Sequence, residues 1–236
     1  MIAITDYDTG NLRSVANALR RIGAEFTVTS DAAVLRQADR VLLPGVGEAS
    51  SAMAKLRERG LDEVLPTLTC PVLGICIGMQ LLCLSSEEGR AECLGIFPTR
   101  VRRLPTTAVE EILHEAAASP TLPDTAPPAA TPTGRHTDRP LPETSDASSR
   151  LKVPHVGWDT IEGLRSPLFE GIPEQSYVYY VHSYAADLCP ATIATTDYAR
   201  RFSAALRRDN FYGTQFHPEK SGTTGARILQ NFLNLK

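Results

Sequence analysis

The amino-acid sequence predicts an α/β fold with a central mixed, mostly parallel sheet flanked by helices. Strand-like and helix-like segments alternate through residues 2–59, as they do in a parallel sheet. Strand-like runs dominate the second half. The 236 residues, 42% of them hydrophobic, can bury one sizeable core. We therefore expect a single domain that spans residues 1–236.

In the first half, Asn11 is placed to cap a helix whose apolar residues keep helical spacing, and Gly23 ends that helix. Asp31 can cap a second, short helix. The remaining predicted elements of this half are strands at 2–5, 26–29 and 40–43, and a helix at about 49–59. The second half is predicted to contain strands at 153–161, 177–181, 191–196, 202–206 and 212–216, and a final helix at 225–235.

Residues 104–150 depart from this order. They hold eight Pro, eight Thr and eight Ala and no aromatic residue, so they cannot supply much of a core. We expect a low-complexity, mostly disordered insertion within the domain. Residues 109–118 could form a short helix, but nothing around them suggests a packing partner.

A cysteine is predicted at the turn between a buried strand and a helix. The run Gly74-Ile75-Cys76-Ile77-Gly78-Met79-Gln80 follows an apolar segment. Glycines on both sides of Cys76 reduce steric hindrance in a strained bend, which is the arrangement of a nucleophile elbow. The N–H groups that open the following helix favour a thiolate and can hold an oxyanion. The alternative is a buried core cysteine without a chemical role.

His217 and Glu219 stand two residues apart at the end of a strand-like run. Pro218 between them cannot donate to a sheet, so it indicates a strand terminus. Extended backbone places residues i and i+2 on one face. Glu219 could then orient His217 as the base for Cys76. The alternative is a surface His–Glu pair.

The elbow and the run His217-Pro218-Glu219-Lys220-Ser221 resemble the class I (triad) glutamine amidotransferases. Within that class, further segments resemble the glutaminase subunits of imidazole glycerol phosphate synthase, in histidine biosynthesis. These segments are Asp6-Tyr7, Gly10-Asn11-Leu12-Arg13-Ser14-Val15, Leu43-Pro44-Gly45-Val46-Gly47, Val153-Pro154-His155-Val156-Gly157-Trp158 and Tyr180-Val181-His182-Ser183-Tyr184. The similarity covers nearly the whole chain and implies the fold of this class.

The resemblance implies that the chain hydrolyses L-glutamine without a cofactor or metal. Cys76 would be the nucleophile, His217 the base and Glu219 the group that orients the base. A flexible turn at residues 44–47 would help to form the oxyanion site, although the same turn is also explained as the plain end of a strand. The residues that the resemblance assigns to substrate binding are Gly45, Gly47, Ile77, Gln80, Ser183 and Tyr184.

The resemblance also implies a heterodimer with a cyclase subunit that uses the ammonia. Free ammonia is protonated and lost in water, so a dry passage across an interface is needed. Trp158, the only tryptophan, suits an interface anchor, and the alternative is a core tryptophan. The residues expected to face the partner are Pro154, His155, Trp158, Tyr179 and Lys220.

Three positions differ from the pattern of the family. Asp159 stands where Asn is expected, Asp8-Thr9 replaces small residues, and Glu48-Ala49 replaces an Ala-Phe pair. None of them belongs to the triad. They bear on the interface and on switching of the oxyanion site.

Composition limits the other functions. A net charge of −3 without a long Lys/Arg run excludes an electrostatic footprint for nucleic acid. No segment approaches the roughly 20 apolar residues of a membrane span. The five cysteines lack disulfide-framework or zinc spacing, so we expect reduced thiols and a cytoplasmic protein.

Three other functions remain as alternatives. The chain could be a glutaminase subunit of another enzyme, such as anthranilate or aminodeoxychorismate synthase. A papain-like protease is disfavoured, because its Cys-Gly-Ser-Cys-Trp type of signature is absent. A non-catalytic interaction protein on the same fold is the last alternative, and the presence of all three triad residues argues against it.

Overall fold

The computed structural model describes residues 1–8, 11–106 and 152–235. It divides the chain into two units, residues 1–104 with 153–236, and residues 105–152. All helices and strands given below belong to the first unit. The expected helix at 109–118 and nearly all of the expected insertion at 104–150 lie outside the described residues. We propose that the insertion interrupts a single domain.

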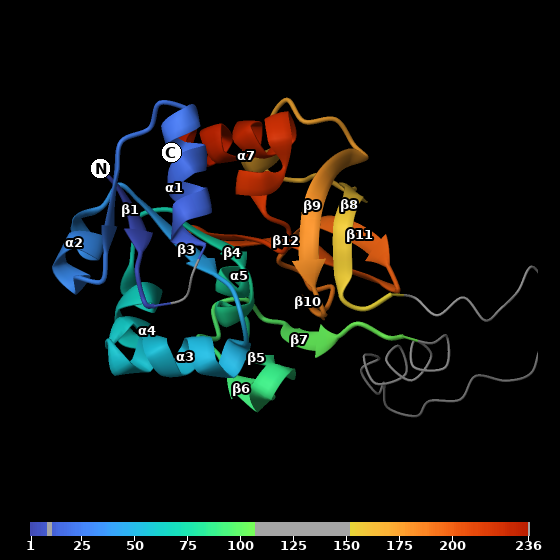
Figure 1. The fold of residues 1–236 in the computed structure, drawn as a ribbon, viewed down its shortest axis with the longest axis horizontal. Coiled ribbons are helices and arrows are strands. Elements are labelled where there is room, and N and C mark those ends of the chain that lie inside the picture. The colour runs from blue at the N-terminus through green and yellow to red at the C-terminus, as the bar shows by residue number, and fades with distance from the viewer. Residues whose placement is uncertain (9–10, 107–151, 236) are drawn as a thin grey trace, which may run out of the picture. The chain divides into compact units, whose positions relative to one another are not determined.

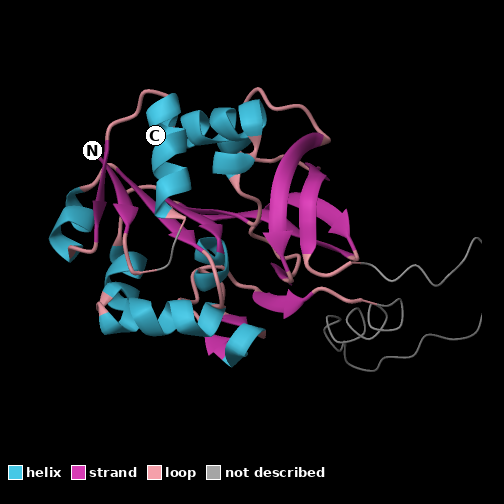
Figure 2. Ribbon diagram, in the orientation of Figure 1, coloured by secondary structure: helices cyan, strands magenta, loops and turns pink. Residues whose placement is uncertain are grey.

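A seven-stranded sheet forms the centre of the first unit (Figures 1 and 2). Its strands lie in the order β11-β12-β13-β4-β3-β1-β2. They run parallel from β13 to β2, whereas β12 is antiparallel to both β11 and β13. This is the mixed, mostly parallel sheet that the sequence predicts. The strands are β1 (Ile2–Thr5), β2 (Phe26–Thr29), β3 (Arg40–Gly45), β4 (Val72–Cys76), β11 (Thr192–Tyr198), β12 (Arg200–Arg208) and β13 (Phe211–Thr214).

Helices cover both faces of this sheet. Figure 1 shows α1 and α7 on one face and α3 and α5 on the other. Amphipathic spacing explains the placement of α1, because its buried residues recur every three or four positions and face the sheet. The helices are α1 (Leu12–Arg21), α2 (Ala32–Gln37), α3 (Ala49–Glu58), α4 (Leu61–Val64), α5 (Ile77–Leu81) and α7 (Gly222–Asn234), and the 3-10 turns are Leu65–Thr67, Glu88–Arg90, Pro167–Phe169 and Pro218–Lys220.

Two smaller sheets complete the first unit. One has four strands in the order β10-β7-β5-β6, and the other is the two-stranded β8–β9 ribbon. The four-stranded sheet was not predicted, because β5, β6 and β10 have only two or three residues each and β7 is a run of three arginines around one valine. The bounds are β5 (Ser85–Ser86), β6 (Ala91–Glu92), β7 (Arg100–Arg103), β8 (His155–Ile161), β9 (Ser176–His182) and β10 (Tyr184–Ala186).

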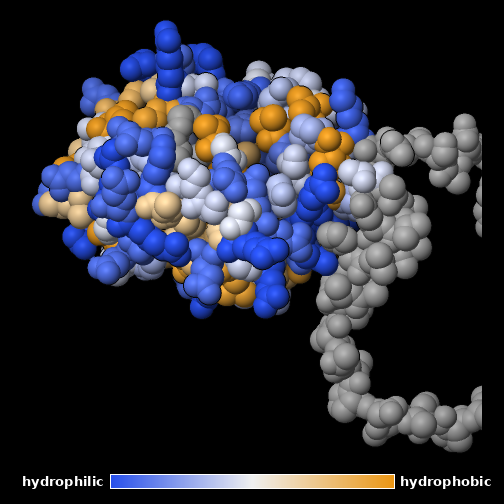
Figure 3. Space-filling model, turned by 60° about the horizontal axis from the view of Figure 1, so that its bottom comes forward, coloured by the Kyte–Doolittle hydropathy of each residue, from blue (hydrophilic) through white to orange (hydrophobic). Residues whose placement is uncertain are grey.

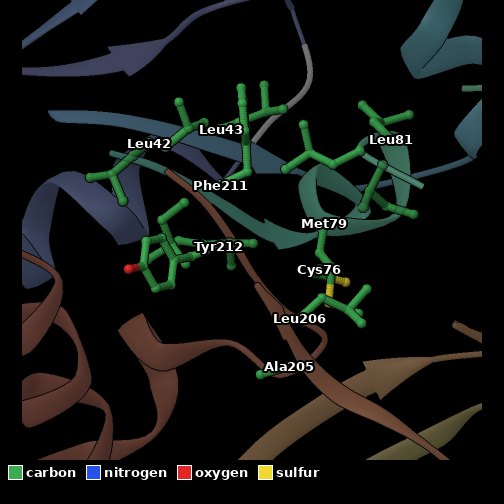
Figure 4. Packing of buried hydrophobic residues seen from close by; sticks show 14 of the residues in the cluster. Leu42, Leu43, Cys76, Met79, Leu81, Ala205, Leu206, Phe211 and Tyr212 are labelled. Carbon is green, nitrogen blue, oxygen red and sulfur yellow. The ribbon is translucent and has the colours of Figure 1, made fainter. Parts of the chain in front are cut away.

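Helix α5 packs closely against the central strands. A Cβ atom added at Gly78 would lie 1.7 Å from the carbonyl oxygen of Leu43, and one at Gly74 would lie 2.7 Å from the backbone of Gly78. Glycine at both positions is therefore what allows the helix to approach the sheet. Met79 of α5 and Leu43 of β3 belong to the buried cluster drawn in Figure 4, as does Cys76. This packing sets the direction in which the chain leaves β4.

Two local expectations are wrong. Asn11 occupies the N-cap position of α1, but its side chain makes no capping hydrogen bond. His217 and Glu219 do not lie along an extended strand, because β13 already ends at Thr214 and Glu219 lies in the 3-10 turn Pro218–Lys220. By contrast, Asp31 caps α2 as expected, and its Oδ1 accepts a hydrogen bond from the backbone N–H of Ala33 at 2.7 Å.

The helices of the described residues were also compared with the length and hydropathy that a membrane span requires. Within the ranges given above, no helix is both long enough and apolar enough to cross a membrane.

The packing of α5 can be tested by substitution. Gly78→Ala should lower the free energy of unfolding by roughly 3 kcal/mol or more, because the new methyl group overlaps the backbone of β3. Gly60→Ala is the matched control, since Gly60 has a φ of +65° but open space around it, and it should cost only about 1–2 kcal/mol. Chemical denaturation measures both. Equal losses would show that α5 does not pack as described.

Candidate active site

Cys76 lies at the junction of β4 and α5, on the turn that the sequence predicts. Its backbone has φ 54° and ψ −110°, a region that non-glycine residues avoid at a cost of about 1–3 kcal/mol. Pairing of Cys76 with Gly45 of β3 and the packing of α5 maintain this conformation. The side chain is buried, and its sulfur lies 3.7 Å from Nε2 of Gln215 and 3.9 Å from the carbonyl oxygen of Val181.

The structure brings His217 and Glu219 to the same edge of the sheet. His217 follows β13, which pairs in parallel with β4, and parallel neighbours end on one side. His217 Nδ1 lies 2.8 Å from Oε1 of Glu219, and both side chains are buried. A carboxylate only accepts, so Nδ1 carries a proton. Nε2 is therefore the ring nitrogen left to act on Cys76.

The charges of the three side chains support one another. Burial acts to lower the pKa of His217, but the charge of Cys76 and the hydrogen bond and charge of Glu219 outweigh it and raise that pKa to about 10. The imidazolium form of His217 is thus favoured beside Cys76 and Glu219.

Helix α1 holds Glu219 through two contacts that the sequence analysis missed. Nδ2 of Asn11 donates to Oε1 of Glu219 at 2.5 Å, and a guanidinium nitrogen of Arg21 donates to the carbonyl oxygen of Glu219 at 3.2 Å. Asn11 is thus a support of the carboxylate instead of a helix cap. Sequence separations of 208 and 198 residues explain why no local pattern could reveal these contacts.

A cavity of about 310 Å³ opens beside Cys76 and His217. It brings together most of the residues predicted to bind substrate, from the loop after β3, from α5 and from the segment after β9. The lining residues are Val46, Gly47, Cys76, Ile77, Gln80, Glu88, Pro154, Val181, His182, Ser183, Tyr184, His217 and Lys220. Gly45 is not among them; it is the buried last residue of β3, where a Cβ would approach the hydroxyl of Tyr7 to 2.7 Å.

Two polar side chains in the cavity wall can accept further hydrogen bonds. The amide nitrogen of Gln80 donates to the carbonyl oxygen of Tyr184 and to Oε1 of Gln215, both at 3.0 Å, while its buried Oε1 has no hydrogen-bond partner among the described residues. Glu88 was not predicted. Its carboxylate accepts from the N–H of Ala49 at 3.1 Å, and burial is the main factor that raises its pKa. Both groups can accept hydrogen bonds from an ammonium group.

The residues expected to face a partner fall into two groups. Trp158 is 54% exposed, which excludes the core alternative, and its ring lies edge-on to Tyr179 at 5.9 Å. Nζ of Lys220 lies 5.8 Å from the centre of the Tyr179 ring, and Pro154 is exposed. His155 differs from the expectation, because it is only 3% exposed and its ring points inward.

Exposed apolar side chains gather on the outer face of the β8–β9 ribbon. Val156 is paired with Val181, and Trp158 with Tyr179, so alternate residues of the two strands share this face. The large exposed side chains on it are Val156, Trp158, Tyr177 and Val181. Figure 3 shows one side of the molecule, where orange hydrophobic patches interrupt a mostly hydrophilic surface.

Within the described part of the chain, no group of three or more His, Cys, Asp or Glu side chains could hold a metal ion.

The raised pKa of His217 predicts a pH dependence of stability. A raised pKa stabilises the folded state fully below the unfolded value of about 6.5, and this contribution is lost as the pH rises through about 10. The free energy of unfolding should therefore fall between these limits. Glu219→Gln removes one cause of the raised pKa of His217, so the free energy of unfolding of this variant should fall over a narrower pH range. Urea denaturation across this pH range checks both, and identical curves would contradict the assignment.

Comparisons with known proteins identify the family of the chain. The chain matches the family described as Glutamine amidotransferase class-I over residues 3–235. It is 46% identical over 234 residues to the imidazole glycerol phosphate synthase subunit HisH of Bacteroides fragilis, with 99% of each chain covered. The proteins of the same name from Bacteroides thetaiotaomicron and Yersinia pseudotuberculosis are 45% and 39% identical, again over 99% of each chain.

Solved structures show the same fold at lower identity. A structure described as a glutamine amidotransferase has a TM-score of 0.63 at 16% identity, covering 99% of this chain and 98% of that one. A glutamine amidotransferase from Thermotoga maritima has a TM-score of 0.56 at 15% identity, covering 99% and 82%. This chain belongs to the class-I glutamine amidotransferase family and, within it, to the HisH subunits of imidazole glycerol phosphate synthase.

Proposed function

We propose that this chain hydrolyses L-glutamine to glutamate and ammonia through the triad Cys76, His217 and Glu219. The observation that carries the proposal is the arrangement of these side chains. A buried thiol on a strained turn lies in a cavity wall beside an imidazole, and that imidazole is bound at 2.8 Å to a buried carboxylate. This is the arrangement that nucleophilic catalysis by cysteine requires.

The first half of the reaction forms a thioester. The Cys76 sulfur attacks the carboxamide carbon, and the carbonyl π electrons move to oxygen. His217, protonated at Nε2, gives its proton to the nitrogen of the tetrahedral intermediate. The C–N bond then breaks, ammonia leaves, and a glutamyl thioester remains on Cys76. Glu219 keeps Nδ1 of His217 protonated and so directs Nε2 toward the reacting atoms.

The second half consumes water. Neutral His217 takes a proton from a water molecule as the water oxygen attacks the thioester carbon. The C–S bond breaks, glutamate is released, and the thiolate and imidazolium are restored. The N–H of Ile77 is a donor for both oxyanions, because the first N–H groups of a helix have no partner within it. Gly47, with a φ of +93°, also lines the cavity and supplies a second peptide there.

The cavity also offers partners for the α-ammonium and α-carboxylate groups of glutamine. The half-buried Glu88 carboxylate and the unpartnered Oε1 of Gln80 suit the α-ammonium group of glutamine. Ser183 and Tyr184 contribute the wall near the α-carboxylate. The hydroxyl of Ser183 and the backbone of this segment can donate to that group.

We further propose that the ammonia passes to a cyclase subunit, which forms imidazole glycerol phosphate and aminoimidazole carboxamide ribotide. Pro154, Val181 and Lys220 line the cavity and also adjoin the exposed apolar face of the β8–β9 ribbon. A partner seated on this face would close the cavity toward solvent and keep ammonia from water. All five cysteines are free, which suits a reducing compartment such as the cytoplasm.

Cys76→Ala should reduce glutamate release from glutamine by on the order of 10⁴-fold or more, because the nucleophile is removed. Circular dichroism and binding to the cyclase subunit should remain unchanged. Cys83→Ala is the matched control, since Cys83 is a buried thiol outside the cavity. It should keep its activity per folded molecule. Activity of Cys76→Ala equal to that of the control would remove the mechanism.

Glu88→Gln should raise KM for glutamine roughly tenfold or more with a smaller change in kcat, because a hydrogen bond between two charged groups is lost. Glu87→Gln is the neighbouring control. Its carboxylate accepts from the N–H of Arg103 and does not line the cavity. Steady-state kinetics in the complex measures both variants, and an unchanged KM for Glu88→Gln would exclude this contact.

Trp158→Ala should weaken binding to the cyclase subunit by about 2 kcal/mol, roughly thirtyfold in Kd, because a large exposed aromatic anchor is lost. Stability should change little, since Trp158 is mostly exposed. Leu188→Ala, which removes an exposed apolar side chain outside the β8–β9 ribbon, is the control. Equal affinities of the two variants, measured by calorimetry, would place the interface elsewhere.

A further inference from the structure

Two buried histidines on the inner face of the β8–β9 ribbon form a chain of contacts between two oxygen acceptors. Nδ1 of His182 lies 2.9 Å from the carbonyl oxygen of Tyr184. Nε2 of His182 lies 3.1 Å from Nδ1 of His155, and Nε2 of His155 lies 3.3 Å from Oδ2 of Asp159. Neither histidine has a part in the reaction proposed above. The chain nevertheless ends at the backbone of the cavity wall.

The number of protons on the ring nitrogens of His182 and His155 decides which of these three contacts are favourable. Carbonyl and carboxylate oxygens only accept, so Nδ1 of His182 and Nε2 of His155 each need a proton. The contact between the rings needs one more, on either of the two facing nitrogens. Two neutral imidazoles together carry only two protons. One of the three contacts therefore brings lone pairs face to face unless the chain takes up an additional proton.

The additional proton belongs on His155. Asp159 is the charged group that faces this ring from β8, and the rings of Tyr180 and Tyr198 stack on it with centroid distances of 4.8 Å and 3.8 Å. Burial lowers the pKa of His155 overall, because the carboxylate of Asp159 offsets only part of the effect, so the additional proton is taken up on acidification. The side chain of Asp159 is about one quarter exposed, so water can supply the proton.

His182 is unsuited to hold that proton. Its neighbours are His155, His217 and Arg200, all of which carry or can carry positive charge. Burial, together with these groups, lowers its pKa to about 3. His182 therefore stays neutral and donates through Nδ1 to Tyr184.

The chain of contacts continues from Tyr184 to the sulfur of Cys76. The carbonyl oxygen of Tyr184 also accepts from the amide of Gln80, which donates in turn to Gln215. Nε2 of Gln215 lies 3.7 Å from the sulfur of Cys76. A shift of the His182 ring, made to relieve a lone-pair contact, would thus release the backbone of a wall that faces the substrate.

We propose that His155 is a positioning residue of the glutamine site: with protons on both ring nitrogens it completes the chain from Asp159 to Tyr184 and fixes the Ser183–Tyr184 segment. The inference rests on the proposed function, because it assumes that the cavity binds glutamine. Glutamine binding is then accompanied by proton uptake, and it tightens on acidification as His155 becomes doubly protonated.

The test measures glutamine binding to the full-length Cys76→Ala variant by calorimetry, from about pH 5.5 to pH 8, in buffers of different ionisation enthalpy. We expect Kd to rise roughly three- to tenfold toward alkaline pH, the effect of one lost hydrogen bond. In Cys76→Ala with Asp159→Asn, the new amide donates to Nε2 of His155. Two neutral imidazoles, with one ring proton each, then make all three contacts favourable. The proton uptake and this rise in Kd should then both vanish.

Asp197→Asn in the same background is the matched control. Asp197 is an exposed carboxylate on β11, and its loss should leave the proton uptake and the pH dependence intact. Titration of Glu88 would weaken binding on acidification, and it would do so equally in all three proteins. A pH dependence that Asp159→Asn does not alter would overturn the role of His155.

A direct measurement of the ring protons needs no substitution at Asp159. Nitrogen NMR of the histidine rings of the Cys76→Ala protein, at acid pH with unhydrolysed glutamine bound, should show two protonated nitrogens on His155 and one on His182. A single proton on His155 would overturn the inference. Failure of the proposed function looks different: Cys76→Ala would bind no glutamine, and the wild type would release no glutamate with or without the cyclase subunit.

Discussion

Helix α5 packs against β3 with no room for a side chain at Gly78, whose Cβ would lie 1.7 Å from the carbonyl oxygen of Leu43. This contact determines how the chain turns at the end of β4. It holds Cys76 at a positive φ, a backbone conformation that is unfavourable for a residue other than glycine. The same contact sets where α5 begins, and Ile77 and Gln80 of this helix line the cavity. The position of Cys76 at the cavity wall thus depends on one helix–strand distance.

His217 and Glu219 reach the edge of the sheet near Cys76 by a different route. Parallel pairing of β13 with β4 brings His217 to the right edge of the sheet, and a 3-10 turn then brings Glu219 back to the imidazole. Helix α1, from the other end of the sequence, holds that turn through Asn11 and Arg21. A buried carboxylate needs such partners, because an unsatisfied charge in the interior is costly. The fold therefore holds Nδ1 of His217 and Oε1 of Glu219 in place, while Nε2 of His217 and Oε2 of Glu219 have no hydrogen-bond partner among the described residues.

The β8–β9 ribbon has two faces with different roles. Its outer face presents apolar side chains around Trp158, and its inner face carries the paired rings of His155 and His182. Asp159 connects the two, since it follows Trp158 in β8 and contacts His155. Through Tyr184 and Gln80, the contacts of His182 extend to the cavity beside Cys76.

The sequence by itself determined the elements whose signals are local. Apolar periodicity predicted the alternation around the central sheet, and the glycines around Cys76 predicted the strained turn. The reason that position 78 must be glycine is nevertheless tertiary, because a Cβ there would meet Leu43 of β3. Only the tertiary structure decided what depends on distant segments. It assigned Asn11 to Glu219, added Glu88 to the cavity and turned His155 inward. It also made a 3-10 turn of a predicted strand end. Contacts between residues about 200 positions apart leave no periodic trace in a sequence, since they depend on how packed elements meet in space.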